Sequence, residues 1–208
     1  MTDDDLATRL RATGPLPATE VARILSAAAD VVDRRIAEDR PHGRISPAAI
    51  VAPANGDVLL ADPATLGRLP ETGAHAAPEI ITGAPADARS EVFSLASTAY
   101  SLLTGTTPNS FGIANARRAR PDLGPGLEAA LMRATSRDPA FRYQSAGDFA
   151  RALADALAPA AESGPPTPAA EDRPRRISAL GLLSLIAGVL AVVSVLLWGG
   201  ILLAQNLS

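Results

Sequence analysis

A long uncharged segment near the C-terminal end constrains most strongly what this chain can fold into. No residue from Ile177 to Ser208 is charged, and residues 177–204 are almost continuously apolar. At about 1.5 Å per residue, such a helix reaches roughly 42 Å, enough to cross a ~30 Å hydrocarbon core with some tilt. A signal peptide is excluded because the run lies at the wrong end of the chain. Residues 177–204 are therefore predicted to form one transmembrane helix, followed by a short extracytoplasmic tail, 205–208.

Basic residues flank only the N-terminal end of this segment, at Arg173, Arg175 and Arg176. The positive-inside rule then predicts a single-pass cell-membrane protein whose N-terminal domain, residues 1–157, lies in the cytoplasm. Residues 158–176 are rich in Pro and Ala and are predicted to be a disordered linker with a basic juxtamembrane end. The lipid bilayer is the first expected partner. Small-residue pairs within 184–191 could also allow a homodimer of membrane helices, although such residues are common in membrane helices generally.

Composition narrows the function classes for the N-terminal domain. The formal net charge is −3, and no basic face with interleaved aromatic residues is evident, so no nucleic-acid partner is expected. There is no cysteine, which excludes disulfides, thiolate metal sites and a cysteine nucleophile. The two histidines, His42 and His75, are too few for a histidine-based metal site without added carboxylates. No metal or cofactor is predicted.

Hydrophobic periodicity predicts a mainly helical domain with one small hairpin. Apolar residues at helical spacing run from Val21 to Ile36, with Thr19 as the expected N-cap. A second stripe, from Val92 to Leu103, is apolar nearly all round and is expected to be a central buried helix. Between them, residues 50–52 and 58–60 are predicted to pair as strands around a turn at 55–56.

The loop between these elements carries a specific pattern. Residues 42–50 read HGRISPAAI. This resembles the catalytic loop of the bacterial eukaryotic-like (Hanks-type) serine/threonine protein kinases, His-Arg-Asp-Leu-Lys-Pro-x-Asn-Ile. Aligned on Pro47 and Ile50, the family's base Asp falls on Arg44, its Lys on Ser46 and its metal-binding Asn on Ala49.

Further matches follow in the family's order along the chain. They are Ala61-Asp62-Pro63-Ala64 at the position of Asp-Phe-Gly, Ala77-Pro78-Glu79, Arg89 to Leu95, Leu102 to Gly105, and Arg137 to Ala146. The resemblance implies that residues 1–157 form a kinase-like C-lobe, a helical bundle with one small β-hairpin. No glycine-rich phosphate loop occurs in the sequence, so the N-lobe of a kinase is expected to be absent.

The resemblance also implies that the chemistry is lost. In the kinase template, the loop Asp accepts the substrate hydroxyl proton, and the Asn and the Asp-Phe-Gly Asp hold magnesium. Arg44 has no lone pair with which to accept a proton. Ala49 has no oxygen for a hard cation, which leaves Asp62 as a lone carboxylate. We therefore expect no enzyme activity, and His42 is interpreted as a packing residue rather than a general base.

Other matched residues are expected to be structural or regulatory. Glu79 and Arg142 correspond to a buried ion pair of the family, and Glu91 replaces the Asp that accepts hydrogen bonds from the loop backbone. Thr65 and Thr72 lie in the counterpart of the activation segment and are candidate phosphorylation sites.

The predicted function is that of a membrane-anchored, catalytically inactive pseudokinase acting as a scaffold or regulatory binding module in serine/threonine-kinase signalling. The expected protein partner is a kinase, a phosphopeptide-reader domain or a cell-envelope protein. One alternative is an atypical or truncated kinase that binds ATP, completed by a separate N-lobe or by one encoded upstream. Another is a gene fragment without function.

Overall fold

The computed structural model describes residues 5–53, 57–66, 73–109, 113 and 115–158. The predicted membrane helix 177–204, the tail 205–208 and all but the first residue of the predicted linker 158–176 lie outside these residues. Within the described part, no helix is long and apolar enough to cross a membrane.

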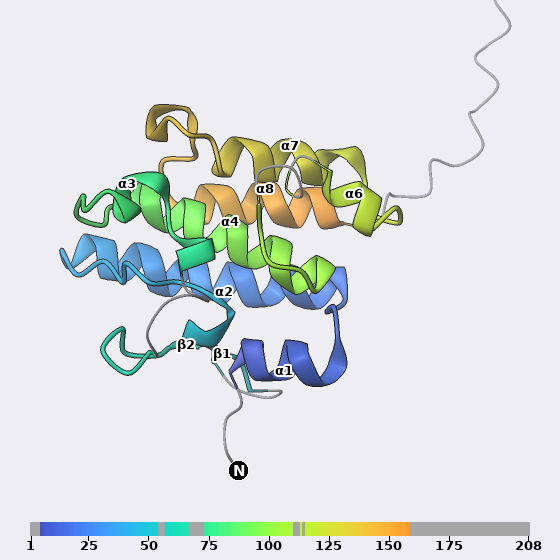
Figure 1. Ribbon diagram of the computed structural model, residues 1–208, viewed down its shortest axis with the longest axis horizontal. Helices are drawn as coiled ribbons and strands as arrows, with labels where there is room; N and C mark the ends of the chain where they lie inside the picture. Colours follow the sequence, from blue (N-terminus) through green and yellow to red (C-terminus); the bar gives the residue numbers. More distant parts are fainter. Residues whose placement is uncertain (1–4, 54–56, 67–72, 110–112, 114, 159–208) are drawn as a thin grey trace, which may run out of the picture. The chain divides into compact units, whose positions relative to one another are not determined.

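The described residues are mainly helical, as the sequence predicts (Figure 1). The longer helices are α1 (Leu6–Thr13), α2 (Ala18–Ala37), α4 (Ala88–Thr104), α7 (Pro125–Ala134) and α8 (Ala146–Leu157). Short helices α3 (Pro78–Ile81) and α6 (Ala116–Ala119) and the 3-10 turns η1 (Pro47–Ala49), η2 (Gly73–His75) and η3 (Pro139–Phe141) connect them. The strands are β1 (Ile50–Val51) and β2 (Leu59–Leu60).

Helix α4 is the centre of the bundle, with α2 on one side and α7 and α8 on another (Figure 1). Its N-terminus is fixed by a capping box, because Asp87 accepts from the N–H of Ser90 while Ser90 accepts from the N–H of Asp87. It ends at Gly105, whose φ of 73° is a left-handed conformation that glycine adopts without steric cost. The predicted burial of α4 on nearly every side is confirmed, since residues from Ser90 to Leu103 are buried except Phe93.

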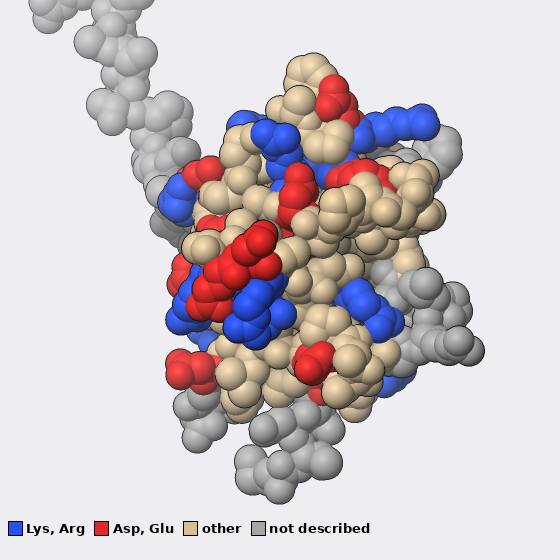
Figure 2. Space-filling model, turned by 90° about the vertical axis from the view of Figure 1, so that its left-hand side faces the viewer, with Lys and Arg blue, Asp and Glu red and all other residues tan. Residues whose placement is uncertain are grey.

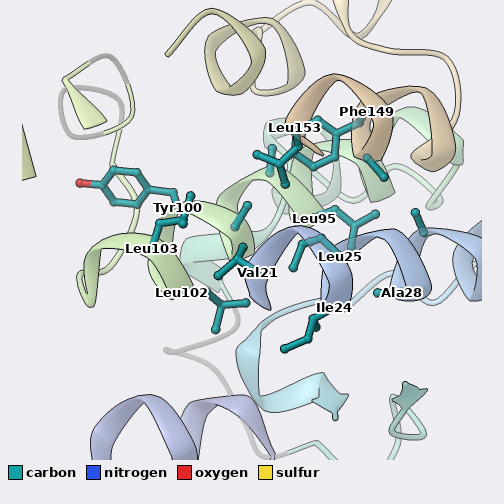
Figure 3. Packing of buried hydrophobic residues seen from close by; sticks show 14 of the residues in the cluster. Val21, Ile24, Leu25, Ala28, Leu95, Tyr100, Leu102, Leu103, Phe149 and Leu153 are labelled. Carbon is teal, nitrogen blue, oxygen red and sulfur yellow. The ribbon is translucent and has the colours of Figure 1, made fainter. Parts of the chain in front are cut away.

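The core is largely aliphatic, and helices α2, α4 and α8 contribute the part of it shown in Figure 3. Ile24 and Leu25 of α2 meet leucine side chains of α4, and the aromatic ring of Phe149 on α8 lies over α4 together with Leu153. Helix α2 begins at Ala18 after Pro17, without a side-chain cap. The prediction that Thr19 is the N-cap is therefore wrong. Pro17 occupies the N-cap position, and the helix already begins at the next residue.

A long-range polar contact joins α2 to α8. The carboxylate of Asp33 on α2 accepts from the backbone N–H groups of Ala146 and Gly147 at 2.9 Å each. These are among the N–H groups that the first turn of a helix leaves unpaired. Asp33 therefore anchors the start of α8 while the apolar faces of the two helices pack together.

The predicted hairpin is present but shorter than expected. Ile50 pairs with Leu60, and Val51 pairs with Leu59, in antiparallel register. Residues 54–56, which include the predicted turn, lie outside the described residues. Val51 also forms a bridge with Asp5, so the start of α1 lies beside this small sheet. The hairpin and α1 together flank the loop from His42 to Ala49.

Candidate functional site

His42 holds the loop in place through both ring nitrogens. Nε2 lies 2.8 Å from the carbonyl oxygen of Ala61, and Nδ1 lies 3.2 Å from the backbone nitrogen of Arg44. A carbonyl can only accept and a backbone N–H can only donate, so the ring is neutral with its proton on Nε2. Burial lowers the pKa of His42, and the nearby charges of Arg35 and Arg44 lower it further. With its lone pair engaged by backbone, His42 has no free position from which to take a substrate proton.

Glu91 on α4 is hydrogen-bonded to the same loop. Its Oε1 accepts from the N–H of Gly43 at 2.7 Å, and the residue is almost fully buried. Its other oxygen, Oε2, is buried without a hydrogen-bond partner in the described part of the chain. Burial raises the pKa of Glu91, and its backbone hydrogen bonds oppose the shift. The glutamate side chain, which is longer than the aspartate expected from the resemblance, thus reaches the loop, but its Oε2 accepts no hydrogen bond from the described residues.

Arg44 crosses from the loop to the segment that follows Asp62. Its Nη1 donates to the carbonyl oxygens of Pro63 at 2.7 Å and Leu66 at 3.3 Å. Where the resemblance to kinases implies a proton acceptor, this chain carries a permanent cation that is hydrogen-bonded to backbone. The guanidinium can orient peptide carbonyls or anions, but it cannot remove a proton.

Asp62 lies in a tight turn stabilised by its own groups. Its Oδ1 accepts from the N–H of Ala64 at 2.8 Å, and its carbonyl oxygen accepts from the N–H and the hydroxyl of Thr65 at 2.9 and 2.7 Å. This arrangement is an Asx-turn. One carboxylate oxygen of Asp62 is therefore already hydrogen-bonded to the local backbone. Thr65 is exposed, whereas Thr72 lies outside the described residues.

Ser46 and Ala49 lie at the base of the loop, where both are buried. Ala49 contributes only backbone groups, and its carbonyl accepts from the N–H of Ala61 at 2.9 Å. The hydroxyl of Ser46 is buried and has no hydrogen-bond partner within the described ranges. Across those ranges, no group of three or more His, Cys, Asp or Glu residues could hold a metal ion.

A buried ion pair lies away from the loop, between α3 and the segment before α8. The guanidinium of Arg142, whose side chain is 0% exposed, contacts both carboxylate oxygens of Glu79, with Nη2 at 2.9 Å from Oε2. Three backbone carbonyls complete its shell: those of Arg89, Ser136 and Arg137. The sequence motifs indicate the two charged partners, but they carry no signal for these carbonyls.

The molecular surface carries both signs of charge. On the face shown in Figure 2, acidic and basic side chains lie next to one another, and wide uncharged regions separate the groups.

Comparison with known proteins identifies relatives of this chain. No model of a protein family matches the chain. The chain is 37% identical over 136 residues to the serine/threonine-protein kinase PknJ of Mycobacterium tuberculosis, covering 57% of this chain and 23% of that protein. It is 29% identical over 225 residues to PknF of the same species, covering 94% of this chain and 46% of that protein. The chain thus spans less than half the length of these curated relatives.

The fold comparison agrees. The crystal structure of the M. tuberculosis PknI kinase domain superposes with a TM-score of 0.63 and 30% sequence identity, over 73% of this chain and 61% of that one. The helical bundle, the small hairpin and the loop at His42 therefore belong to a kinase-like fold. In sequence and in fold, the chain is thus similar to serine/threonine protein kinases.

Proposed function

We propose that this protein is a catalytically inactive member of the kinase family, a pseudokinase that acts by binding other proteins. The observation that carries the proposal is Arg44. In the motif alignment on Pro47 and Ile50 it falls at the position of the family's catalytic base, and its guanidinium is hydrogen-bonded to the carbonyls of Pro63 and Leu66.

The electrostatics of this position oppose phosphoryl transfer. The template reaction needs an acceptor for the hydroxyl proton and oxygen ligands for magnesium ions that bridge the phosphates. Arg44 supplies neither, and Ala49 has no side-chain oxygen. Asp62 keeps a carboxylate, but it caps a turn. A fixed positive charge could bind an anion in this place, but it could not activate a nucleophile.

The rest of the fold supports a binding role, because interactions needed for folding are retained. The Glu79–Arg142 pair, the contact from Glu91 to the loop and the two-sided support of His42 maintain the loop architecture. A decaying gene fragment would not be expected to keep a buried ion pair together with its hydrogen-bonded shell. A scaffold or regulatory module needs this rigidity without the chemistry.

We further propose that the module is anchored to the cell membrane through residues 177–204, with residues 1–157 in the cytoplasm. The uncharged run and the three arginines that precede it support this orientation. The proposed partner is a cytoplasmic or membrane protein of kinase signalling, for example an active kinase, a phosphopeptide reader or a cell-envelope protein.

An atypical kinase that binds ATP is the second candidate. The retained carboxylate of Asp62 favours it, since this group could still hold one magnesium ion. An N-lobe in a separate or longer chain would have to supply the remaining nucleotide contacts.

The deciding experiment measures phosphate transfer from labelled ATP, with Mg²⁺ or Mn²⁺, by the full chain in detergent micelles. The PknI kinase domain serves as the positive control. We expect no transfer to protein substrates above background and no magnesium-dependent thermal shift with ATP. Transfer by the wild-type chain that is lost in Asp62→Asn would overturn the proposal in favour of the atypical kinase.

A further inference from the structure

Strand β2 lies at the edge of the small sheet and borders a cavity. Strand β1 is paired on both sides, with β2 and with Asp5, whereas β2 pairs with β1 alone within the described residues. Beside β2, a cavity of about 570 Å³ lies between residues 57–60 and the C-terminal half of α2. An edge strand presents unpaired backbone groups to which a further strand can add. The hairpin therefore offers one edge for strand addition.

The outward-facing backbone groups of this edge belong to Val58 and Leu60. The N–H of Ala61 donates to the carbonyl oxygen of Ala49 at 2.9 Å, which makes the Ile50–Leu60 pair non-hydrogen-bonded. Because alternate residues of an antiparallel strand bond to opposite sides, the N–H and C=O groups of Val58 and Leu60 point away from β1. No hydrogen bond between described residues uses these groups. They are available to a further strand.

A second copy of β2 fits this edge about a two-fold axis at Leu59. When two copies align antiparallel with Leu59 opposite Leu59, Val58 of each copy faces Leu60 of the other. The outward-facing N–H and C=O groups of these residues then bond to one another between the copies. The side chain of Leu59, which is 56% exposed, meets its counterpart in a non-hydrogen-bonded pair, where opposing side chains lie closest. The axis thus pairs the open edge and covers an exposed leucine.

The charges around the cavity also suit a second copy. Its lining carries two acids, Asp30 and Asp57, and two bases, Arg34 and Arg35. Asp30, Arg34 and Asp57 are exposed and form no ion pair within the described ranges. A surface with both signs in equal number does not favour a strongly acidic or strongly basic partner. In an isologous contact the same surface meets itself, so the acids of each copy can face the arginines of the other.

We propose that the protein forms a homodimer through β2, in which the two hairpins join into one continuous antiparallel sheet centred on Leu59. A contact of this kind is closed by its two-fold symmetry, so it stops at two copies. It also covers an edge that would otherwise be a site for aggregation. The dimer does not depend on whether the protein lacks kinase activity, and it is distinct from any pairing of membrane helices.

Disulfide crosslinking of the full chain in non-ionic detergent tests the register, because the sequence contains no cysteine. Leu59→Cys places two thiols in the non-hydrogen-bonded pair, where Cα atoms lie about 4.5 Å apart, within the roughly 4.4–6.8 Å that a disulfide spans. Asp57→Cys is the matched control, because Asp57 lies opposite Ala61 and its two Cα atoms are roughly 14 Å apart. We expect mild oxidation to link Leu59→Cys at least about tenfold more than Asp57→Cys. Equal yields would refute the register.

Sedimentation equilibrium in the same detergent tests the dimer itself. Leu59→Asp places like charges directly opposite one another, so the dissociation constant of the dimer should rise at least about tenfold. The melting temperature should not fall, since Leu59 is exposed in a single copy. Met132→Asp, at a residue that is 53% exposed, should change the dissociation constant by less than about twofold.

Three results would overturn the proposal. The first is a wild-type chain that stays monomeric. The second is a dimer that Leu59→Asp leaves intact, because that dimer would form through the membrane segment or another surface. The third is crosslinking of Leu59→Cys in cell membranes to a different protein in place of a second copy, which would assign the edge to a foreign strand. The phosphotransfer assay tests the proposed function separately.

Discussion

Removing the carboxylate of Glu79 is the sharpest test of how this fold is held together. Arg142 makes five hydrogen bonds to described residues, two of them to Glu79, and its own side chain is 0% exposed while that of Glu79 is 24% exposed. Charge-assisted hydrogen bonds contribute about 1.5–3 kcal/mol each, and breaking a buried pair costs about 3–5 kcal/mol. The three carbonyls still solvate Arg142 in Glu79→Ala. We therefore expect the lower limit, about 3 kcal/mol.

Thermal melting of the full chain in detergent measures this loss. For a domain of this size, 1 kcal/mol corresponds to about 2–4 °C, so Glu79→Ala should melt about 6–12 °C below wild type. Glu38→Ala is the matched control, because Glu38 and Arg40 form an exposed pair with side chains 51% and 66% exposed. Such pairs contribute less than about 1 kcal/mol. Equal, small shifts for both variants would refute the idea that the buried pair stabilises the domain.

The pH dependence gives an independent readout of the same contact. Burial alone would raise the pKa of Glu79, but the hydrogen bonds and charge of Arg142 hold the pKa below its ordinary value of 4.5. The ion pair therefore contributes fully above about pH 4.5 and is lost as pH falls through the folded-state pKa. The difference in melting temperature between wild type and Glu79→Ala should shrink as pH falls below 4.5. A constant difference would contradict the pairing argument.

Three further outcomes follow from the site. Glu91→Gln should gain stability relative to wild type as pH rises from 5 to 8, because burial raises the pKa of Glu91 and disfavours its ionised form in the folded state. A melting-temperature difference between the two proteins that does not change with pH would contradict this. Asp33→Ala should lower the free energy of unfolding in urea by about 2 kcal/mol through loss of two backbone contacts at α8, whereas an unchanged midpoint would show that water replaces them. Arg44→Ala should accelerate amide hydrogen exchange around Leu66, which loses a carbonyl contact, and unchanged exchange would show that the segment is held by other groups.

The regular parts of the fold could be predicted from sequence because a helix or strand that buries one face has apolar residues at a regular spacing. The stripe from Val92 to Leu103 identifies a central helix, and the apolar residues around Ile50 and Leu60 identify a hairpin. The strands are shorter than predicted, and only two residues of each strand are paired. Local capping was less predictable, since a proline before Ala18 replaced the expected threonine cap.

The contacts of the site could be predicted only in part. The resemblance to the kinase family implies that Glu79 and Arg142 pair, and the two side chains do form an ion pair. The contact of Arg44 with Leu66 joins irregular segments and depends on backbone carbonyls, which every residue carries. The buried hydroxyl of Ser46, which has no hydrogen-bond partner among the described residues, could likewise not be predicted from sequence, because pairing is a property of three-dimensional packing.

The packing of α8 on α2 has a consequence for how the chain folds on the ribosome. Helix α2 ends at Ala37, and α8, which together with α4 covers its apolar face, is complete only at Leu157. At about 5–20 residues per second, this interval of roughly 120 residues takes on the order of 6–24 s. During that time part of the aliphatic face of α2 stays exposed on the nascent chain, and apolar surface exposed in this way is prone to aggregation until α8 docks.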